Sequence, residues 1–177
     1  YNFPQQSAVP FSHDLIARLL KAFPTVIKGV KDSSGDFENM RKMAELFAKD
    51  GFEVYSGSDE FLTKMLAAGG AGCITAASNV NSPYGARVYA APGSADGEAA
   101  QAVLTATRRA VTTVPLIAGL RSLMARHSGH AGFKTIRPPN MPLSAEQEAK
   151  FFATFDATGA VLAPVQFLAF LVSFGLV

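Results

Sequence analysis

One lysine stands at the end of an aliphatic run, in the stretch TVIKGVKDSSG that covers residues 25–35. This pattern predicts a buried strand that ends in a loop at Lys31. Parallel α/β folds carry their chemistry at the carboxyl ends of strands. An ammonium group is not a nucleophile, but burial disfavours the charged form and leaves an amine that attacks a ketone to form a Schiff base. The alternative is a solvated surface lysine, the usual state of this residue.

Helices and strands alternate around this lysine. Ser12 is an expected N-cap for a helix that ends near Phe23-Pro24, just before the lysine strand. Asp36 is an expected cap for a second helix, which Asp50-Gly51 ends, and residues 53–56 form a short strand. The predicted order is therefore helix, strand, helix, strand.

The same pattern then repeats. Residues 57–59 lead into a helix that contains Phe61 and Leu66, and the glycine-rich residues 69–72 lead into a strand at 73–76. Strands that alternate with helices predict a parallel sheet, because parallel neighbours need a crossover connection. The glycines follow a helix and precede a strand, which is the reverse of a phosphate-binding loop, so a nucleotide site is not expected there.

Beyond residue 76 the sequence predicts helices alone. These cover residues 81–90, then 95 to about 126 with an interruption near Pro115, and a last helix capped by Ser144 that runs to Asp156. From residue 159 to 177 the chain is almost wholly apolar, and its length is that of a minimal membrane span. Pro164 inside this run and the absence of flanking basic residues favour a buried tail over insertion.

Composition excludes several classes of protein. With 177 residues, of which 49% are hydrophobic and 17% charged, the chain can bury a sizeable core. The net charge of +2 comes without a basic run, so nucleic acid is not an expected partner. The single cysteine, Cys73, is predicted to be an inert buried thiol and, with no leader before it, indicates a reducing cytoplasm. His13, His127 and His130 lack metal-ligand spacing, so no metal or other cofactor is expected.

Four motifs occur in an order that resembles one enzyme family. They are YNFP at residues 1–4, GVKDSSG at 29–35, SGSD at 56–59 and GGAGCIT at 69–75. Together they resemble the dihydrodipicolinate synthase and N-acetylneuraminate lyase family as far as about Asp156. The resemblance implies an α/β fold, namely the C-terminal part of a (β/α)8 TIM barrel with about three parallel strands, followed by a helical region. The expected division is a partial barrel at 1–79, a helical region at 80–158 and an apolar tail at 159–177.

The resemblance also implies a site and a reaction. Lys31 matches the Schiff-base lysine, Tyr1 matches a proton-relaying tyrosine, and Gly57 and Ile74 match positions that line the keto-acid pocket. The implied chemistry is class I aldol addition or cleavage on pyruvate or another 2-keto acid, with an aldehyde as the second substrate. Strand alternation places Gly29 on the face of Lys31, where we expect it to leave space beside the amine.

The charged residues near Lys31 are interpreted as structural rather than catalytic. The carboxylates Asp32, Asp36 and Glu38 are interpreted as turn and cap residues, although a carboxylate close to a lysine would favour its charged form. Lys28 is expected on the opposite strand face from Lys31, with its amine reaching toward an edge.

Two departures from the family pattern limit the prediction. Many dihydrodipicolinate synthases carry an arginine where this chain has Gln6, and an amide cannot replace a bidentate guanidinium. A sugar-acid or other 2-keto-acid lyase is therefore as consistent with the motifs. The family's first barrel half has no counterpart here, so weak or no activity is expected of this chain alone. For the intact protein the resemblance implies a homo-oligomer. The alternative is a non-catalytic fragment that acts as a binding or assembly module.

Overall fold

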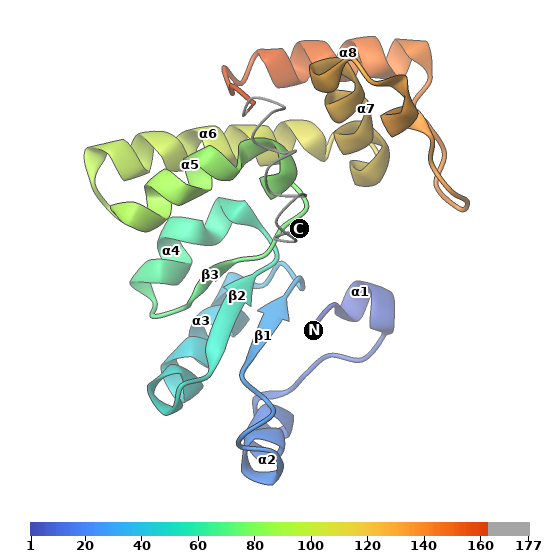
Figure 1. Ribbon diagram of the computed structural model, residues 1–177. Coiled ribbons are helices and arrows are strands. Elements are labelled where there is room, and N and C mark those ends of the chain that lie inside the picture. Colours follow the sequence, from blue (N-terminus) through green and yellow to red (C-terminus); the bar gives the residue numbers. More distant parts are fainter. Residues whose placement is uncertain (163–177) are drawn as a thin grey trace. The chain divides into compact units, whose positions relative to one another are not determined.

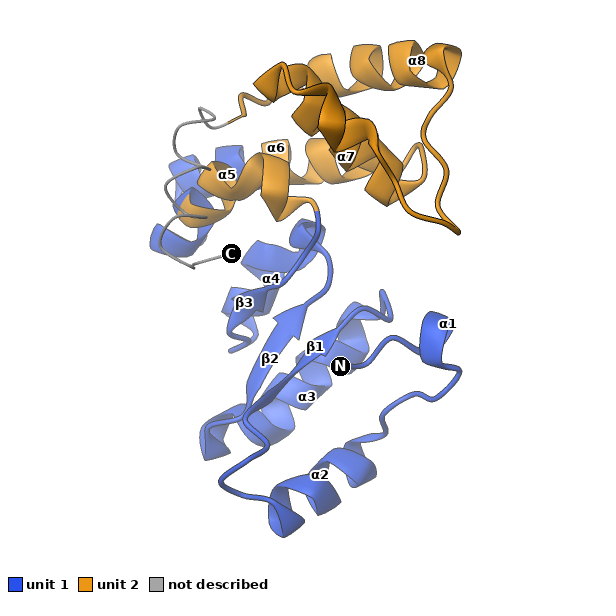
Figure 2. Ribbon diagram, turned by 45° about the vertical axis from the view of Figure 1, so that its right-hand side comes forward, with its two compact units in different colours: residues 1–76, 87–101 blue, residues 77–86, 102–177 orange. Residues whose placement is uncertain are grey.

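The computed structural model describes residues 1–162, which form two compact units. Unit 1 contains residues 1–76 and 87–101, and unit 2 contains residues 77–86 together with the chain from residue 102 onward (Figure 2). Helices α5 (Ser78–Ala90) and α6 (Ala95–Val111) each contribute residues to both units.

Unit 1 is built on a three-stranded parallel sheet with the strand order β1-β2-β3 (Figure 1). The strands are β1 (Gly29–Asp32), β2 (Glu53–Ser56) and β3 (Gly72–Cys73). An isolated parallel bridge from Asn2 to Asp32 adds the start of the chain to β1. The predicted parallel arrangement of three strands is confirmed.

Helices connect these strands as predicted. After the short helix α1 (Pro4–Ser7), α2 (His13–Ala22) precedes β1 and α3 (Phe37–Phe47) follows it. The predicted caps are confirmed, because the Ser12 hydroxyl accepts a hydrogen bond from the Leu15 amide and the Asp36 carboxylate accepts one from the Asn39 amide. The 3-10 turns η1 (Ala48–Asp50) and η2 (Asp59–Phe61) and helix α4 (Leu62–Ala67) complete the connections.

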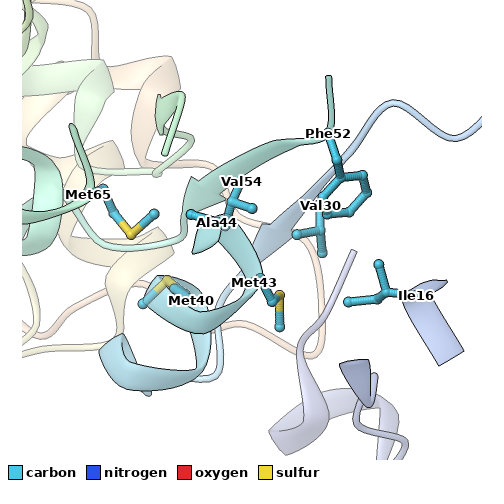
Figure 3. Close-up of a cluster of buried hydrophobic side chains, with 8 residues drawn as sticks. All are labelled: Ile16, Val30, Met40, Met43, Ala44, Phe52, Val54 and Met65. Atoms are coloured by element: carbon cyan, nitrogen blue, oxygen red, sulfur yellow. The ribbon is translucent and has the colours of Figure 1, made fainter. Parts of the chain in front are cut away.

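The two faces of the sheet differ. Val30 and Val54 are buried and pack with Met40 and Met43 of α3, whereas the register partners Lys31 and Tyr55 are only half-buried. Successive strand residues point to opposite faces, so the lysine lies on the face away from α3. Burial of the apolar face is the main stabilising contribution of this unit. The buried cluster, shown in Figure 3, consists of Ile16, Val30, Met40, Met43, Ala44, Phe52, Val54 and Met65.

Unit 2 is helical in the part that the structure describes. It includes α7 (Leu116–Ser128), the 3-10 turn η3 (Ala131–Lys134) and α8 (Ala145–Asp156). The predicted interruption near Pro115 is confirmed, since α6 ends before this residue and α7 begins after it. The core of unit 2 consists of Ala77, Val80, Ala110, Val111, Leu120, Leu123, Phe151 and Phe155.

Several boundaries were predicted wrongly. The aliphatic residues before Gly29 form no strand: the amides of Val26 and Ile27 both donate to the carbonyl of Phe23 in a turn after α2, and Val26 is 71% exposed. The third strand covers Gly72–Cys73 rather than residues 73–76. Helix α5 begins at residue 78 rather than 81.

The apolar tail predicted at 159–177 lies mostly outside the described residues. Within its described beginning, Ala160 and Leu162 pack against the core of unit 2. Between residues 1 and 162, no helix combines the length and the apolar character that a membrane crossing requires.

Candidate functional site

The structure brings Lys31 and Tyr1 together. The Lys31 Nζ atom lies 4.4 Å from the centroid of the Tyr1 ring, the geometry of a cation–π contact. Lys31 is half-buried, whereas Tyr1 is 61% exposed. An amine and a phenol that lie thirty positions apart in the sequence thus share one end of β1.

Main-chain hydrogen bonds place Tyr1 there. The amide of Asn2 donates to the carbonyl of Lys31 (2.9 Å), and the amide of Ser33 donates to the carbonyl of Asn2 (2.8 Å). Residue 2 therefore runs alongside the carboxyl end of β1 as an added strand position. The residue before it, Tyr1, is carried to the level of the lysine.

Asp32 makes more hydrogen bonds than the predicted turn role requires. It is the last residue of β1, fully buried, and its Oδ2 atom accepts hydrogen bonds from the side-chain amides of Asn2 (2.6 Å) and Asn39 (3.1 Å). Its Oδ1 atom accepts from the Ser34 amide (2.8 Å) and hydroxyl (2.5 Å). The interpretation as a turn residue is confirmed for Oδ1, whose bond from the Ser34 amide is that of an Asx turn, but it is incomplete, because Oδ2 accepts from side chains of other segments.

The two other carboxylates after β1 serve α3. Asp36 is the N-cap of the helix, as predicted. Glu38 lies in its first turn and forms an exposed ion pair with Arg41 (2.8 Å). Their partners are thus Asn39 and Arg41, whereas Lys31 lies against the ring of Tyr1.

Gly57 follows β2 and lies against the loop after β1. Its amide donates to the carbonyl of Asp32 (2.6 Å). A Cβ atom at this position would lie 2.1 Å from the Ser33 Oγ atom and 2.8 Å from the Ser33 Cα atom. The loop after β2 therefore lies so close to Ser33, in the loop after β1, that position 57 requires glycine.

Ile74 follows β3 and is 48% exposed. Its amide donates to the carbonyl of Ser56 (2.9 Å), which extends the ladder between β2 and β3 by one bond. Lys31, Gly57 and Ile74 thus occupy the carboxyl ends of three adjacent strands. The pocket-lining roles of Gly57 and Ile74 stay predictions.

The expected purpose of Gly29 was wrong. A Cβ atom there would lie 2.4 Å from the carbonyl oxygen of Glu53, so glycine lets β2 approach β1 rather than leaving space beside the amine. Lys28 precedes the strand, is exposed, and its Nζ atom donates to the carbonyl of Pro24 (3.4 Å). The strand-face argument therefore does not apply to Lys28.

Two other side chains of the sheet, Cys73 and Tyr55, have raised pKa values for different reasons. Burial raises the pKa of the Cys73 thiol to about 11, with a smaller contribution from Asp59, so the thiol is protonated at neutral pH. The Tyr55 hydroxyl donates to Glu53 (2.7 Å), and this bond raises the pKa of the phenol. Within residues 1–162 no three His, Cys, Asp or Glu side chains form a group that could hold a metal ion.

Sequence reasoning missed Asn2 and Asn39. Both amides reach the carboxylate of Asp32 from segments that only the fold brings near it. Asn2 stands directly after Tyr1 in the YNFP motif, which is the one signal that could have identified it. Gln6 is exposed in α1, and its neutral side-chain amide stands where the family pattern has an arginine.

Sequence comparison gives relatives over most of the chain. A "DapA-like lyase" from Chloroflexus aurantiacus is 32% identical over 165 residues, which cover 93% of this chain and 54% of the relative. A 4-hydroxy-tetrahydrodipicolinate synthase from Bartonella bacilliformis is 34% identical over 166 residues, or 91% of this chain and 54% of the relative. The chain therefore spans about half the length of these relatives.

Solved structures show the same fold. YagE from Escherichia coli K12, in complex with pyruvate, has a TM-score of 0.79 at 20% identity and covers 91% of this chain and 55% of its own. A Sulfolobus 2-keto-3-deoxygluconate aldolase in complex with D-KDPG has a TM-score of 0.75 at 18% identity. The match covers 99% of this chain and 55% of the aldolase. The expected fold class is confirmed: this is the C-terminal part of a (β/α)8 barrel followed by a helical region.

A family model extends over nearly the whole described chain. The model of the dihydrodipicolinate synthetase family matches residues 1–158, a range that contains Tyr1, Lys31, Gly57 and Ile74. The chain belongs to the dihydrodipicolinate synthetase family.

Proposed function

We propose that this chain carries the imine-forming part of a class I aldolase-type lyase or synthase that acts on pyruvate or another 2-keto acid. The observation that carries the proposal is the contact between the Lys31 amine and the Tyr1 ring at the carboxyl end of β1. Lys31 is the nucleophile, and the Tyr1 phenol moves protons. Structural relatives named as a pyruvate complex and as a keto-sugar aldolase agree with this class of substrate.

The proposed reaction begins with attack of the Lys31 amine on the keto carbon. A carbon–nitrogen bond forms and the keto oxygen leaves as water after proton transfer. The protonated imine then withdraws electrons from the adjacent carbon, which loses a proton and becomes an enamine that adds to an aldehyde; cleavage is the reverse. A phenol hydroxyl both donates and accepts a hydrogen bond, so Tyr1 suits the transfers to and from the departing oxygen.

Residues around Lys31 bear on which keto acid the proposed site would accept. Gly57 and Ile74 are proposed to line the keto-acid pocket: Gly57 follows β2, the neighbour of the lysine strand, and Ile74 follows β3, the next strand of the sheet. Gln6 offers no charge to a second carboxylate, so a 2-keto-acid or sugar-acid lyase is as well supported as dihydrodipicolinate synthesis.

We further propose a cytoplasmic location, a homo-oligomeric intact protein, and a division at residues 79 and 158 into barrel, helical region and tail.

Borohydride reduction in the presence of pyruvate tests the assignment. A reduced adduct on Lys31, located by peptide mass mapping, is the expected result. The matched control is Lys28→Arg, which makes the same change three residues earlier at an exposed site. Lys31→Arg should abolish the adduct while Lys28→Arg retains it, and Tyr1→Phe should slow its formation about 10²- to 10⁴-fold, the range of general acid–base catalysis. An adduct that survives Lys31→Arg contradicts the assignment.

The extent of the sheet supports impaired activity. Residues 1–162 supply three strands, and three strands cannot close an eight-stranded barrel. We therefore expect trapping well below one pyruvate per chain, and trapping near one per chain contradicts the impairment.

The second candidate is a non-catalytic binding or assembly module, favoured because the three strands of residues 1–162 form an open sheet rather than a closed barrel. A folded chain, shown by circular dichroism, that gives no adduct on Lys31 would support the module.

A further inference from the structure

We propose that Asp32 is a positioning residue that holds Tyr1 against Lys31 through the side chain of Asn2. This inference rests on the proposed function only for its catalytic consequence, because the positioning itself is a property of the free protein. Its basis is a buried hydrogen-bond network behind the site.

The carboxylate of Asp32 cannot serve the substrate directly. It is fully buried, and its two oxygens accept four hydrogen bonds, from Asn2, Asn39 and twice from Ser34. Adjacent strand residues point to opposite faces, so its side chain leaves β1 on the face opposite to Lys31. A buried polar group is stable only when hydrogen bonds satisfy it, and here they do. The arrangement therefore suits fixing its donors in place rather than proton transfer at the imine.

Asn2 is the donor that matters for Tyr1. Its main chain makes two hydrogen bonds to β1 and the residue after it, and its Nδ2 atom donates to Asp32 (2.6 Å). Its Oδ1 atom accepts from the amide of Phe11 (3.0 Å), which closes the segment from residue 2 to residue 11. Tyr1 itself is mostly exposed and has ring contacts with Lys31 and Phe3. Its position therefore depends on the residue beside it.

Asn39 and His13 extend the hydrogen-bond network of Asp32. The carboxylate accepts hydrogen bonds, so the Nδ2 atom of Asn39 must face it, and the Oδ1 atom of Asn39 is left to accept from His13. The His13 Nε2 atom lies 2.9 Å from this oxygen, which assigns the ring proton to Nε2. Strand β1, helices α2 and α3, and the first two residues are joined in this way through one carboxylate.

The position of Tyr1 can be measured without any keto acid. Reductive methylation with ¹³C-formaldehyde labels the lysines of the full chain, and a methyl group on Lys31 lies above the Tyr1 ring, whose current shifts its resonance upfield. Loss of the signal in Lys31→Arg assigns it, and return to the ordinary position in Tyr1→Leu confirms the ring as the cause. Absence of any such shifted signal in the wild-type protein overturns the proposal.

Three variants then test the carboxylate. Asp32→Asn replaces one acceptor oxygen by a donor, and Asn2→Ala removes the link while leaving the main-chain bonds intact; both should return the Lys31 signal toward its ordinary position. Asp36→Asn makes the same chemical change at an exposed cap where Asn serves equally well, and should leave the signal unchanged. If Asp32→Asn fails to fold, Asn2→Ala decides. A Lys31 signal that keeps its full upfield shift in folded Asn2→Ala overturns the proposal.

Kinetic coupling separates positioning from general stability. If Asn2 acts through Tyr1, Asn2→Ala should slow pyruvate trapping in the wild-type background and have little further effect in Tyr1→Phe. Equal slowing in both backgrounds would contradict positioning. The two proposals can also fail separately. If the wild-type chain shows the ring-shifted Lys31 signal and Asn2→Ala loses it, the positioning role of Asp32 is supported. If that same wild-type chain traps no pyruvate, the proposed function is rejected.

Discussion

Gly57→Ala is the substitution for which the structure makes the sharpest demand. The added Cβ atom would lie 2.1 Å from the Ser33 Oγ atom, 2.8 Å from the Ser33 Cα atom and 2.9 Å from the Asp32 carbonyl oxygen. The hydroxyl could rotate away, but the other two atoms belong to the main chain. The loop after β1 must therefore move, and with it the hydrogen bond from the Gly57 amide to Asp32 (2.6 Å).

The expected cost combines two effects. Overpacking of a tight site costs about 1–3 kcal/mol, and the strained hydrogen bond contributes about 0.5–1.5 kcal/mol. The free energy of unfolding should therefore fall by about 2–4 kcal/mol, out of a total of about 5–15 kcal/mol for a typical domain. Because the displaced loop begins at Ser33, two residues after Lys31, the pyruvate adduct on Lys31 should decrease as well.

Urea unfolding followed by circular dichroism measures this cost against a matched control. Gly85→Ala makes the same change in helix α5, where the new Cβ atom meets no atom within 4 Å. Alanine is the better helix former, so this control should gain about 0.5–1 kcal/mol. The two variants thus have opposite expected signs. A Gly57→Ala protein as stable as the wild type would refute the close approach, and would leave only the pocket-lining role for that glycine.

Three further predictions concern single groups. Ser144→Ala removes the side-chain cap of α8 and should lower the free energy of unfolding by about 0.5–2 kcal/mol in the same urea assay, whereas Ser144→Asp should retain it. Alkylation of half-buried Cys73 by iodoacetamide should be slow at pH 7 and reach half of its limiting rate near pH 11, the pKa to which burial raises this thiol; a fast reaction at pH 7 would contradict the raised pKa. The hydrogen bond from Lys134 lowers the pKa of Glu148, so the stabilisation is present above the unfolded pKa of about 4.5 and is lost as the pH falls through the lower folded pKa. Lys134→Met should therefore show a smaller fall in melting temperature from pH 7 to pH 3 than the wild type, and an equal fall would count against the pair.

Local chemistry explains which parts of the fold the sequence could predict. The caps at Ser12, Asp36 and Ser144 are confirmed, because each side chain bonds an amide only three residues further on. The strand Glu53–Ser56 was also predicted with its observed bounds, since it lies between a helix that ends in a glycine turn and the SGSD motif. In each case the determining residues are neighbours in the chain.

The errors arise where a distant partner decides the outcome. Hydrophobicity before Gly29 suggested a strand, but strand pairing begins only at residue 29, where β2 lies alongside. Gly29 itself looked like space for the amine, whereas its lack of a side chain accommodates the Glu53 carbonyl. Neither the partner strand nor its distance can be read from the apolar pattern of one segment.

Asp32 follows Lys31 directly, so strand alternation also decides the face on which its side chain lies. Alternation along β1 was used to place Lys31 on one face, and it equally requires Asp32 to leave the strand on the other. A carboxylate in the sequence DSSG resembles a turn residue as long as its surroundings are unknown. Once Val30 is found buried on that face, an aspartate beside it needs donors, and local sequence supplies only Ser34. The missing donors had to come from elsewhere, and Asn2, the residue that carries Tyr1 to the lysine, is one of them.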